Sequence, residues 1–316
     1  MQKLRLVFAG TPAAAVPSLE RLAASGHEIV AVVTRPAAPI GRKRVLTPSP
    51  VARAAERLGL EVIEAARLDD EATTRLAASA PDLGVIVAYG GLVREPLLST
   101  PVHGWINLHF SLLPAWRGAA PVQHALINDD PATGAAVFQL VAELDAGDVF
   151  AELSHRIEPG DTAGSLLETL AERGGALLSD VVDGIAEGTA RAIPQAGEPS
   201  FAPKLRIDDA RIDWNEPARS VLARYRGVTP EPGAWTTLDG ARLKLLGLAA
   251  APTPTDLGVE ALPTLAVGEL AAVGRRLLIG TADVPVEVVQ VQPAGRTAMP
   301  AADWWRGAGR VGAVAA

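Results

Sequence analysis

Three polar side chains of this sequence have the types needed for acyl transfer. Asn107 and His109 lie two residues apart at the end of the apolar run 105–109. Because successive side chains of an extended backbone point to opposite faces, this spacing places both on one face. Asp145, within Leu144-Asp-Ala-Gly-Asp148, could join them. An amide, an imidazole and a carboxylate together can stabilise an oxyanion and move a proton, which is the chemistry that acyl transfer requires.

Other kinds of site are less well supported. Ser111 near His109 suggests a serine hydrolase, but no G-x-S-x-G elbow surrounds it, so we expect it to bind rather than to attack. Gly10-Thr11-Pro12 lacks the spacing of dinucleotide and phosphate-binding loops and predicts a tight turn. The five histidines have no metal-ligand spacing, and we expect no metal. A lone histidine beside an asparagine is usually structural, so the catalytic assignment needs support from the rest of the chain.

The composition is that of a soluble globular protein. The chain has 316 residues, 48% of them hydrophobic and 21% charged, which favours two domains over one. It contains no cysteine, which excludes disulfides and thiol catalysis. Neither a signal peptide nor an apolar run of membrane-spanning length is recognisable, and we predict a cytoplasmic protein.

Apolar runs alternate with helical segments through residues 1–188. The runs lack sustained polar alternation, as is typical of parallel strands buried on both faces. Strands separated by helices predict an α/β domain with helices on both faces of a parallel sheet. We expect Thr11, Ser49 and Asp69 to cap the first three helices. The predicted strands are 4–9, 29–34, 61–64, 83–88, 105–109, 133–141 and 149–157, and a long helix is predicted over 161–188.

The pattern changes in the C-terminal third. Periodicity fails over 189–207, where prolines and glycine cluster, and we predict a linker there. Short strands then follow through 208–316, with Asp239-Gly240 as a tight hairpin signal. The predicted elements are strands at 234–238, 242–248, 276–279 and 285–292 and a helix at 217–225. These elements are compatible with a small barrel of the oligonucleotide-binding (OB) type or with a sandwich.

The charge of the chain is uneven. Residues 1–203 carry 16 Lys and Arg against 24 Asp and Glu, whereas residues 204–316 carry 13 against 12. Within the acidic part, the stretch 29–55 contains no carboxylate. Its basic residues are Arg35, Arg42, Lys43, Arg44 and Arg53. Such a segment could meet phosphate even on an acidic protein, although a solvated surface loop is the simpler interpretation.

Several segments together resemble the folate-dependent formyltransferases, and in particular the branch of that family that acts on methionyl-tRNA. The segments are Asn107-Leu-His-Phe-Ser-Leu-Leu-Pro114, Arg117-Gly118 and Asp145-Ala-Gly147, then Ile212-Asp-Trp214 and Pro230-Glu-Pro-Gly-Ala-Trp235. Val141 and Glu143 depart from the family pattern, which usually has Asp and Gly there. The resemblance spans nearly the whole chain.

This resemblance implies a Rossmann-like parallel-sheet catalytic domain over 1–188, a linker over 189–207 and an OB-like tRNA-binding barrel over 208–316. It implies formyl transfer from 10-formyltetrahydrofolate to the α-amino group of methionyl-tRNA without a metal. The sequence leaves the oligomeric state open, and a monomer is favoured. Asn107 and a protonated His109 would stabilise the oxyanion while Asp145 orients and charges His109. The implied folate contacts are Val87, Ala88, Tyr89, Gly90, Ser111, Leu112, Leu113 and Pro114, and the implied tRNA contacts are Arg42, Lys43, Arg44 and Arg296.

Two other functions stay open at this point. A related formyltransferase acting on a small amine, such as glycinamide ribonucleotide or an amino sugar nucleotide, or a deformylase, would use the same three residues. Neither accounts for the strand-rich C-terminal part. A nucleic-acid-binding protein with an inactive catalytic domain would have no need of an intact Asn107, His109 and Asp145.

Overall fold

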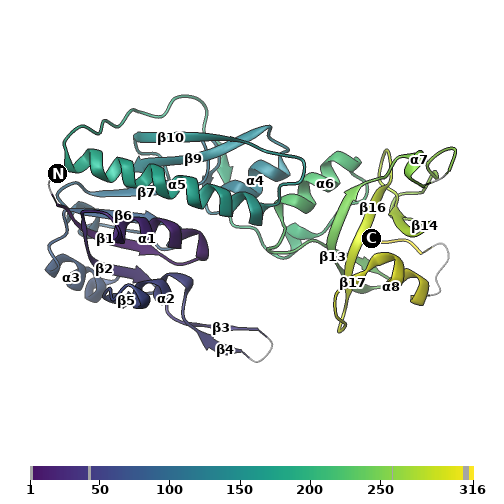
Figure 1. The fold of residues 1–316 in the computed structure, drawn as a ribbon, viewed down its shortest axis with the longest axis horizontal. Coiled ribbons are helices and arrows are strands. Elements are labelled where there is room, and N and C mark those ends of the chain that lie inside the picture. The colour runs from purple at the N-terminus through teal and green to yellow at the C-terminus, as the bar shows by residue number, and fades with distance from the viewer. Residues whose placement is uncertain (1–2, 42–43, 258, 309–312) are drawn as a thin grey trace. The chain divides into compact units, whose positions relative to one another are not determined.

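The computed structural model describes residues 3–41, 44–257, 259–308 and 313–316. The chain forms two compact units. Figure 1 colours the ribbon by residue number, from purple at the N-terminus to yellow at the C-terminus. Unit 1 comprises Met1–Pro121, Ala132–Arg156 and Leu167–Pro203, and unit 2 comprises Val122–Pro131, Ile157–Leu166 and Lys204–Ala316. Two short segments from within residues 1–188 therefore belong to unit 2. The functional domain limits 1–188, 189–207 and 208–316 stay predictions.

Unit 1 is built on a seven-stranded sheet of order β10-β9-β7-β6-β1-β2-β5. The strands are β1 (Arg5–Gly10), β2 (Glu28–Thr34), β5 (Val62–Glu64), β6 (Leu83–Val87), β7 (Trp105–His109), β9 (Ala132–Gln139) and β10 (Val149–Arg156). The pairs among β5, β2, β1, β6 and β7 are parallel, as predicted. β9 pairs antiparallel with β7, and β10 with β9, so the sheet has an antiparallel edge that was not predicted.

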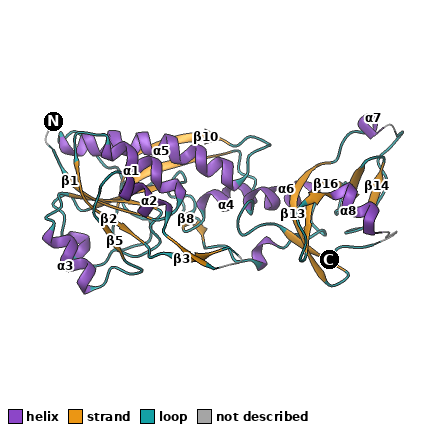
Figure 2. Cartoon of the chain, turned by 60° about the horizontal axis from the view of Figure 1, so that its bottom comes forward, coloured by secondary structure: helices purple, strands orange, loops and turns teal. Residues whose placement is uncertain are grey.

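Helices cover both faces of this sheet (Figure 2). They are α1 (Val16–Ala23), α2 (Pro50–Arg57), α3 (Asp70–Ala78) and the long α5 (Ala163–Ala186). On one face, Leu76 of α3 is buried in a cluster with Val7 and Trp105. On the other, a Cβ on Gly174 of α5 would lie 3.1 Å from the Leu108 side chain. The predicted α/β arrangement is therefore confirmed.

Two of the three predicted helix caps are confirmed and one is wrong. Ser49 Oγ accepts from the Ala52 N–H at 2.9 Å, and Asp69 Oδ1 accepts from the Ala72 N–H at 3.0 Å. Thr11 does not cap α1, because a 3-10 turn at Ala13–Ala15 intervenes. Its hydroxyl instead donates to the Tyr89 carbonyl at 3.0 Å, which ties the end of β1 to the loop after β6.

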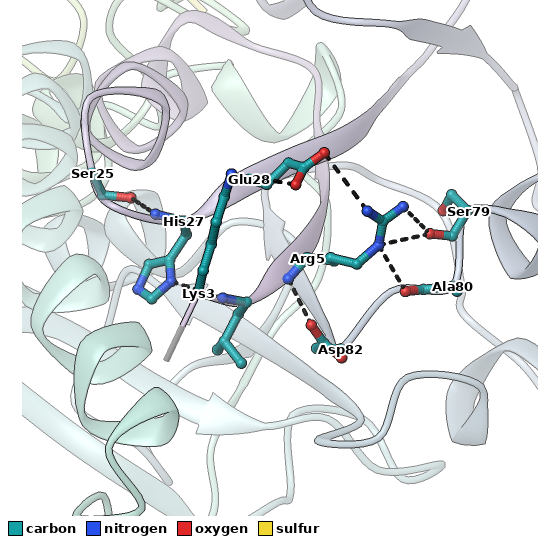
Figure 3. A network of polar contacts seen from close by, with 9 residues as sticks. Lys3, Arg5, Ser25, His27, Glu28, Ser79, Ala80 and Asp82 are labelled. Carbon is teal, nitrogen blue, oxygen red and sulfur yellow. Dashed lines mark hydrogen bonds and ion pairs between the residues drawn. The ribbon is translucent and has the colours of Figure 1, made fainter. Parts of the chain in front are cut away.

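Polar contacts fix the register at the opposite end of β1, as Figure 3 shows. The Arg5 guanidinium donates to the Ser79 carbonyl at 2.8 Å, and the Arg5 N–H donates to Asp82 at 2.8 Å. His27 Nδ1 accepts from the Leu4 N–H, so in a neutral ring the other nitrogen donates to Asp183 at 2.9 Å. His27 is a structural histidine with both nitrogens satisfied.

Unit 2 contains an antiparallel sheet of order β12-β13-β16-β15-β14, with β17 paired to β16. The strands are β12 (Trp235–Leu238), β13 (Ala241–Ala250), β14 (Leu270–Val273), β15 (Arg276–Ile279), β16 (Val286–Pro293) and β17 (Met299–Pro300). The accompanying helices are α4 (Pro121–Ile127), α6 (Ala218–Gly227), α7 (Pro254–Leu257) and α8 (Ala301–Ala308). Asp239 and Gly240 both have positive φ and form the predicted hairpin turn.

The C-terminal residues close this sheet. Thr237 and Ala316 exchange backbone hydrogen bonds of 3.0 and 2.9 Å beside β12. On the other side, the Leu270 N–H donates to the Ala313 carbonyl at 3.1 Å, and Val314 bridges Glu269 beside β14. Both open edges are therefore joined through one segment, which gives a small barrel rather than the sandwich that the strand pattern also allowed.

Candidate active site

Asn107 and His109 lie on one face of β7, in the middle of the unit 1 sheet. Asn107 is opposite Ile86 in β6 and Phe138 in β9, and His109 is opposite Ala136. His109 is 5% exposed and meets the Phe138 ring edge-on, with centroids 6.3 Å apart. The imidazole is thus held in an apolar environment at the carboxyl end of a parallel strand, where open α/β sheets bind their ligands.

The chain returns Asp145 to this position through the loop between β9 and β10. Asp145 Oδ2 lies 3.8 Å from His109 Nδ1, and the two side chains are only 11% and 6% exposed. The same carboxylate oxygen accepts a hydrogen bond from the Gly118 N–H at 2.7 Å. At 3.8 Å the carboxylate acts on the imidazole through its charge rather than through a direct hydrogen bond.

The other nitrogen of His109 is fixed by the backbone. Nε2 donates to the Trp116 carbonyl oxygen at 2.9 Å, and a carbonyl can only accept, so Nε2 carries a proton. In the neutral ring the lone pair is therefore on Nδ1, the nitrogen that faces Asp145. The Trp116 N–H donates in turn to Ser200 Oγ at 2.9 Å.

Burial sets the charge of His109. It is the largest influence on the imidazole and lowers the pKa of His109 below its ordinary value. The Asp145 carboxylate and the Trp116 carbonyl oppose this effect and raise the pKa. The sequence analysis expects a protonated His109 beside the oxyanion. Asp145 acts in that direction, but burial has the larger effect on the pKa and favours the neutral ring at rest.

Asn107 has an unsatisfied group. Its Oδ1 atom is buried and has no hydrogen-bond partner among the described residues. Leaving a buried acceptor unpaired costs about 1–3 kcal/mol, so such an atom marks a position where a ligand donor can bind. It lies on the same strand face as the His109 imidazole.

The first predicted folate segment follows β6. Val87 and Tyr89 are buried, and the Tyr89 hydroxyl donates to the Ala65 carbonyl at 2.7 Å, away from the loop surface. Ala88 and Gly90 are exposed and have positive φ angles of 49° and 76°. A ligand here would meet Ala88, Gly90 and the peptide groups rather than the tyrosine ring.

The second predicted folate segment follows β7. Ser111 is buried, and its hydroxyl donates to the Ala115 carbonyl at 2.6 Å, which stabilises the turn. Leu113 packs against Ala136 and Phe138 in the core. Leu112 and Pro114 are half-buried, so part of their apolar surface is open to a ligand.

The predicted tRNA contacts lie in different surroundings. Arg42 and Lys43 fall outside the described residues. Arg44 is exposed, with φ of 49°, next to the short hairpin of β3 (Ala38–Ile40) and β4 (Val45–Thr47). Arg296 is exposed in the turn between β16 and β17 of unit 2.

Sequence reasoning missed three residues around the catalytic loop: Trp116, Gln195 and Ser200. Gly118 was recognised only as part of the Arg117-Gly118 segment and was given no contact. Gln195 and Ser200 belong to the predicted linker, but residues up to 203 are part of unit 1. Gln195 contacts both Arg117 and the Asp145 loop. Glu143, at one of the positions that depart from the family pattern, forms an ion pair with Arg117 at 3.5 Å. Ser200 is 84 residues from Trp116, and Gln195 is 50 residues from Asp145, so no local signal identifies these contacts.

Two negative findings concern the described residues alone. They contain no group of three or more His, Cys, Asp or Glu side chains arranged to hold a metal ion. None of the helices within the described ranges is long and apolar enough to cross a membrane.

Comparison with solved structures supports the fold. The chain is similar to HypX from Aquifex aeolicus in complex with tetrahydrofolic acid, with a TM-score of 0.64 and 17% identity over 96% of this chain and 47% of that one. It is also similar to the N-formyltransferase from Helicobacter canadensis in complex with folinic acid and dTDP-3-aminofucose. That match has a TM-score of 0.68 and 16% identity over 92% and 99% of the two chains.

Sequence comparison identifies the family. Residues 3–182 match the formyl transferase family, and residues 204–309 match the formyl transferase C-terminal domain. The methionyl-tRNA formyltransferase of Leifsonia xyli is 62% identical over 97% of this chain and 98% of its own length. That of Thermobifida fusca is 53% identical over 98% and 97%. The chain therefore belongs to the formyl transferase family, and within it to the methionyl-tRNA formyltransferases.

Proposed function

We propose that this chain transfers the formyl group of 10-formyltetrahydrofolate to the α-amino group of methionyl-tRNA, with Asn107, His109 and Asp145 as its catalytic residues. One observation carries the assignment of roles. A buried imidazole has one nitrogen fixed by the Trp116 carbonyl and the other facing Asp145, on the strand face that also holds the unpaired amide oxygen of Asn107.

The reaction begins with attack of the free amine on the formyl carbon. A carbon–nitrogen bond forms, and the carbonyl electron pair moves onto oxygen to give a tetrahedral oxyanion. The Asn107 side chain supplies an N–H donor for this oxyanion and an oxygen that accepts from the attacking amine. One such oxyanion donor typically contributes about 2.7–4 kcal/mol of transition-state stabilisation.

His109 moves the proton. Because its resting form is neutral, Nδ1 has a free lone pair and accepts the proton released by the attacking amine. The imidazolium then has Asp145 at 3.8 Å to stabilise its charge. When the bond between the formyl carbon and the folate nitrogen breaks, His109 returns this proton to the departing nitrogen. The residue therefore ends the cycle as it began.

The binding assignments are part of the same proposal. Folate would lie against the loops 87–90 and 111–114, between two half-buried apolar side chains and exposed peptide groups. The basic segment containing Arg42, Lys43 and Arg44 would contact the RNA backbone, as would Arg296 in the barrel. We further propose that the protein works as a cytoplasmic monomer, with residues 1–188 as the catalytic domain and 208–316 as the tRNA-binding domain.

A comparison of acceptors tests the proposed function. The protein is incubated with 10-formyltetrahydrofolate together with charged initiator tRNA, with an amino sugar nucleotide, with glycinamide ribonucleotide or with no acceptor. Release of tetrahydrofolate is then followed. We expect tetrahydrofolate to be released only when methionyl-tRNA is the acceptor. Faster turnover with a small amine would replace the proposed acceptor, and turnover without any acceptor would indicate a deformylase.

A further inference from the structure

We propose that Gln195 is a positioning residue for formyl transfer, which holds the loop of Asp145 in place so that the carboxylate faces His109. The inference rests on the proposed function of the catalytic residues. Gln195 lies in the segment that was predicted to be a linker, and it is half-buried against unit 1. Its amide does not contact His109, so it acts on the reaction through Asp145.

The amide of Gln195 connects two parts of the site. Nε2 donates to the carbonyl oxygens of Asp145 and Gly147, both at 2.8 Å. Oε1 accepts from Arg117 Nε at 3.2 Å and from Nη2 at 2.7 Å. Both donor hydrogens of this side chain thus bind the Asp145 loop, and its acceptor binds Arg117.

The Asp145 loop needs such a support. Asp145 itself has a positive φ of 45°, which side chains other than glycine seldom adopt. Two residues later, a Cβ on Gly147 would lie 1.7 Å from the Gln139 carbonyl oxygen, so this part of the loop fits against β9 only as glycine. Gln195 bonds to the carbonyl groups on both sides of Ala146 and thereby holds the turn in its tight conformation.

The same segment holds the other partner of His109. We call residues 195–202 the clamp segment. Ser200 Oγ accepts from the Trp116 N–H at 2.9 Å, and its carbonyl accepts from the Arg117 N–H at 2.8 Å. β11 (Phe201–Ala202) pairs in parallel with β8 (Arg117–Gly118). The clamp segment therefore fixes both the Trp116 carbonyl, which binds Nε2, and the loop of Asp145, which faces Nδ1.

These contacts predict how the pKa of His109 would change if the clamp segment no longer held the Asp145 loop in place. The groups that face His109 are the Asp145 carboxylate, the Trp116 carbonyl and the Phe138 ring, and of the described residues Asp145 is the charged one that shifts its pKa. Because the carboxylate raises that pKa, its retreat would lower the pKa of His109 further. A displaced Asp145 therefore lowers the midpoint of the His109 titration, whereas a loss of stability without displacement of Asp145 leaves this midpoint unchanged.

Two substitutions separate the contacts of Gln195. Gln195→Met keeps the size of the side chain and removes all of its hydrogen bonds. Gln195→Glu keeps an acceptor for Arg117 but cannot donate to the Asp145 and Gly147 carbonyls at neutral pH. Glu198→Gln changes an exposed residue of the same segment and serves as the matched control.

The experiment measures kcat, both KM values, the melting temperature, and the His109 titration by NMR without substrates. For Gln195→Met we expect kcat to fall roughly ten- to a hundredfold, each KM to stay within about threefold, and the His109 midpoint to move to lower pH. Gln195→Glu should lose at least tenfold in kcat, because the donor contacts to the loop are the ones that position Asp145. Glu198→Gln should match the parent in every measurement.

Other outcomes would overturn the proposal. A Gln195→Met variant with parental kcat and an unmoved His109 midpoint would show that the contact is unimportant. A lower melting temperature and kcat with an unmoved midpoint would assign Gln195 to folding alone. Failure of the proposed function is distinguishable, because then the parent itself would not formylate methionyl-tRNA while the titration of His109 would still report the position of Asp145.

Discussion

Asp145 Oδ2 lies 3.8 Å from His109 Nδ1, while the opposite nitrogen of the same ring donates to the Trp116 carbonyl at 2.9 Å. The carbonyl fixes the tautomer, and the carboxylate faces the nitrogen that is free to take a proton. Since burial keeps the pKa of His109 low, the imidazole is ready to act as a base rather than already charged.

The strand face shared by Asn107 and His109 leads to the first prediction. Asn107→Ala and His109→Ala should each lower kcat roughly a hundred- to a thousandfold, because each removes a group that acts on the reacting atoms. The affinity for methionyl-tRNA, measured by filter binding without folate, should change little, since neither residue is assigned to phosphate. A variant that keeps most of its turnover would exclude the substituted residue from the mechanism.

Burial of His109 also makes folding depend on pH. A histidine whose pKa is depressed in the folded state favours folding fully above its unfolded value of about 6.5, and this contribution is lost as the pH falls below that value. The free energy of unfolding in urea should therefore decrease from pH 7.5 to pH 5.5. His109→Gln, which cannot be protonated, should show a shallower decrease. Parallel curves for the two proteins would contradict a neutral buried His109.

Gly118 should tolerate no side chain. It has φ of 126°, and a Cβ there would lie 2.7 Å from the Ala202 carbonyl oxygen. Gly118→Ala should push β8 away from β11 and break the hydrogen bond from the residue 118 N–H to Asp145. We expect a lower melting temperature and a kcat reduced at least tenfold. Gly188→Ala is the control, because Gly188 also has a positive φ, of 68°, but has open space around its Cβ. Equal effects of the two substitutions would attribute the loss to backbone strain alone.

The basic segment provides a prediction about the substrate. Replacing Arg42, Lys43 and Arg44 by Gln should raise the KM for methionyl-tRNA and flatten its dependence on salt, because fewer counterions are released. The KM for 10-formyltetrahydrofolate should not change. A variant with Arg57, Arg75 and Arg191 replaced by Gln, which removes three exposed positive charges outside this segment, controls for net charge. A triple variant that formylates charged tRNA like the parent across a salt series would make the segment a solvated surface feature.

The sequence predicted those parts of the structure that depend on local patterns. β7 occupies the predicted residues 105–109, because a buried strand is recognisable from its apolar run. The caps at Ser49 and Asp69 follow from side chains that bond the backbone three residues ahead. The predicted cap at Thr11 was wrong because the Thr11 hydroxyl donates to the Tyr89 carbonyl, 78 residues away. A long-range partner of this kind has no signature in a single sequence.

The same distinction applies to the site. Asn107 and His109 could be placed together from strand alternation, but the supports of His109 come from segments that meet only in the fold. Gln195 lies in a stretch rich in proline and glycine that is typical of a linker, yet its hydrogen bonds connect residues 117 and 145. Likewise, the low pKa of His109 depends on burial by the folded chain, which outweighs the carboxylate that the sequence identified.

The pH dependence of formyl transfer in Asp145→Asn tests the central claim most directly. The single-turnover rate of the parent should rise with pH as His109 becomes neutral and then reach a plateau. Asn keeps the size of Asp145 and an acceptor for the Gly118 N–H but removes the charge that raises the pKa of His109. We therefore predict a rise displaced to lower pH and a plateau reduced at least tenfold, because the imidazolium loses its counter-charge. An undisplaced profile with a parental plateau would contradict the account and leave Asp145 as a residue of loop structure.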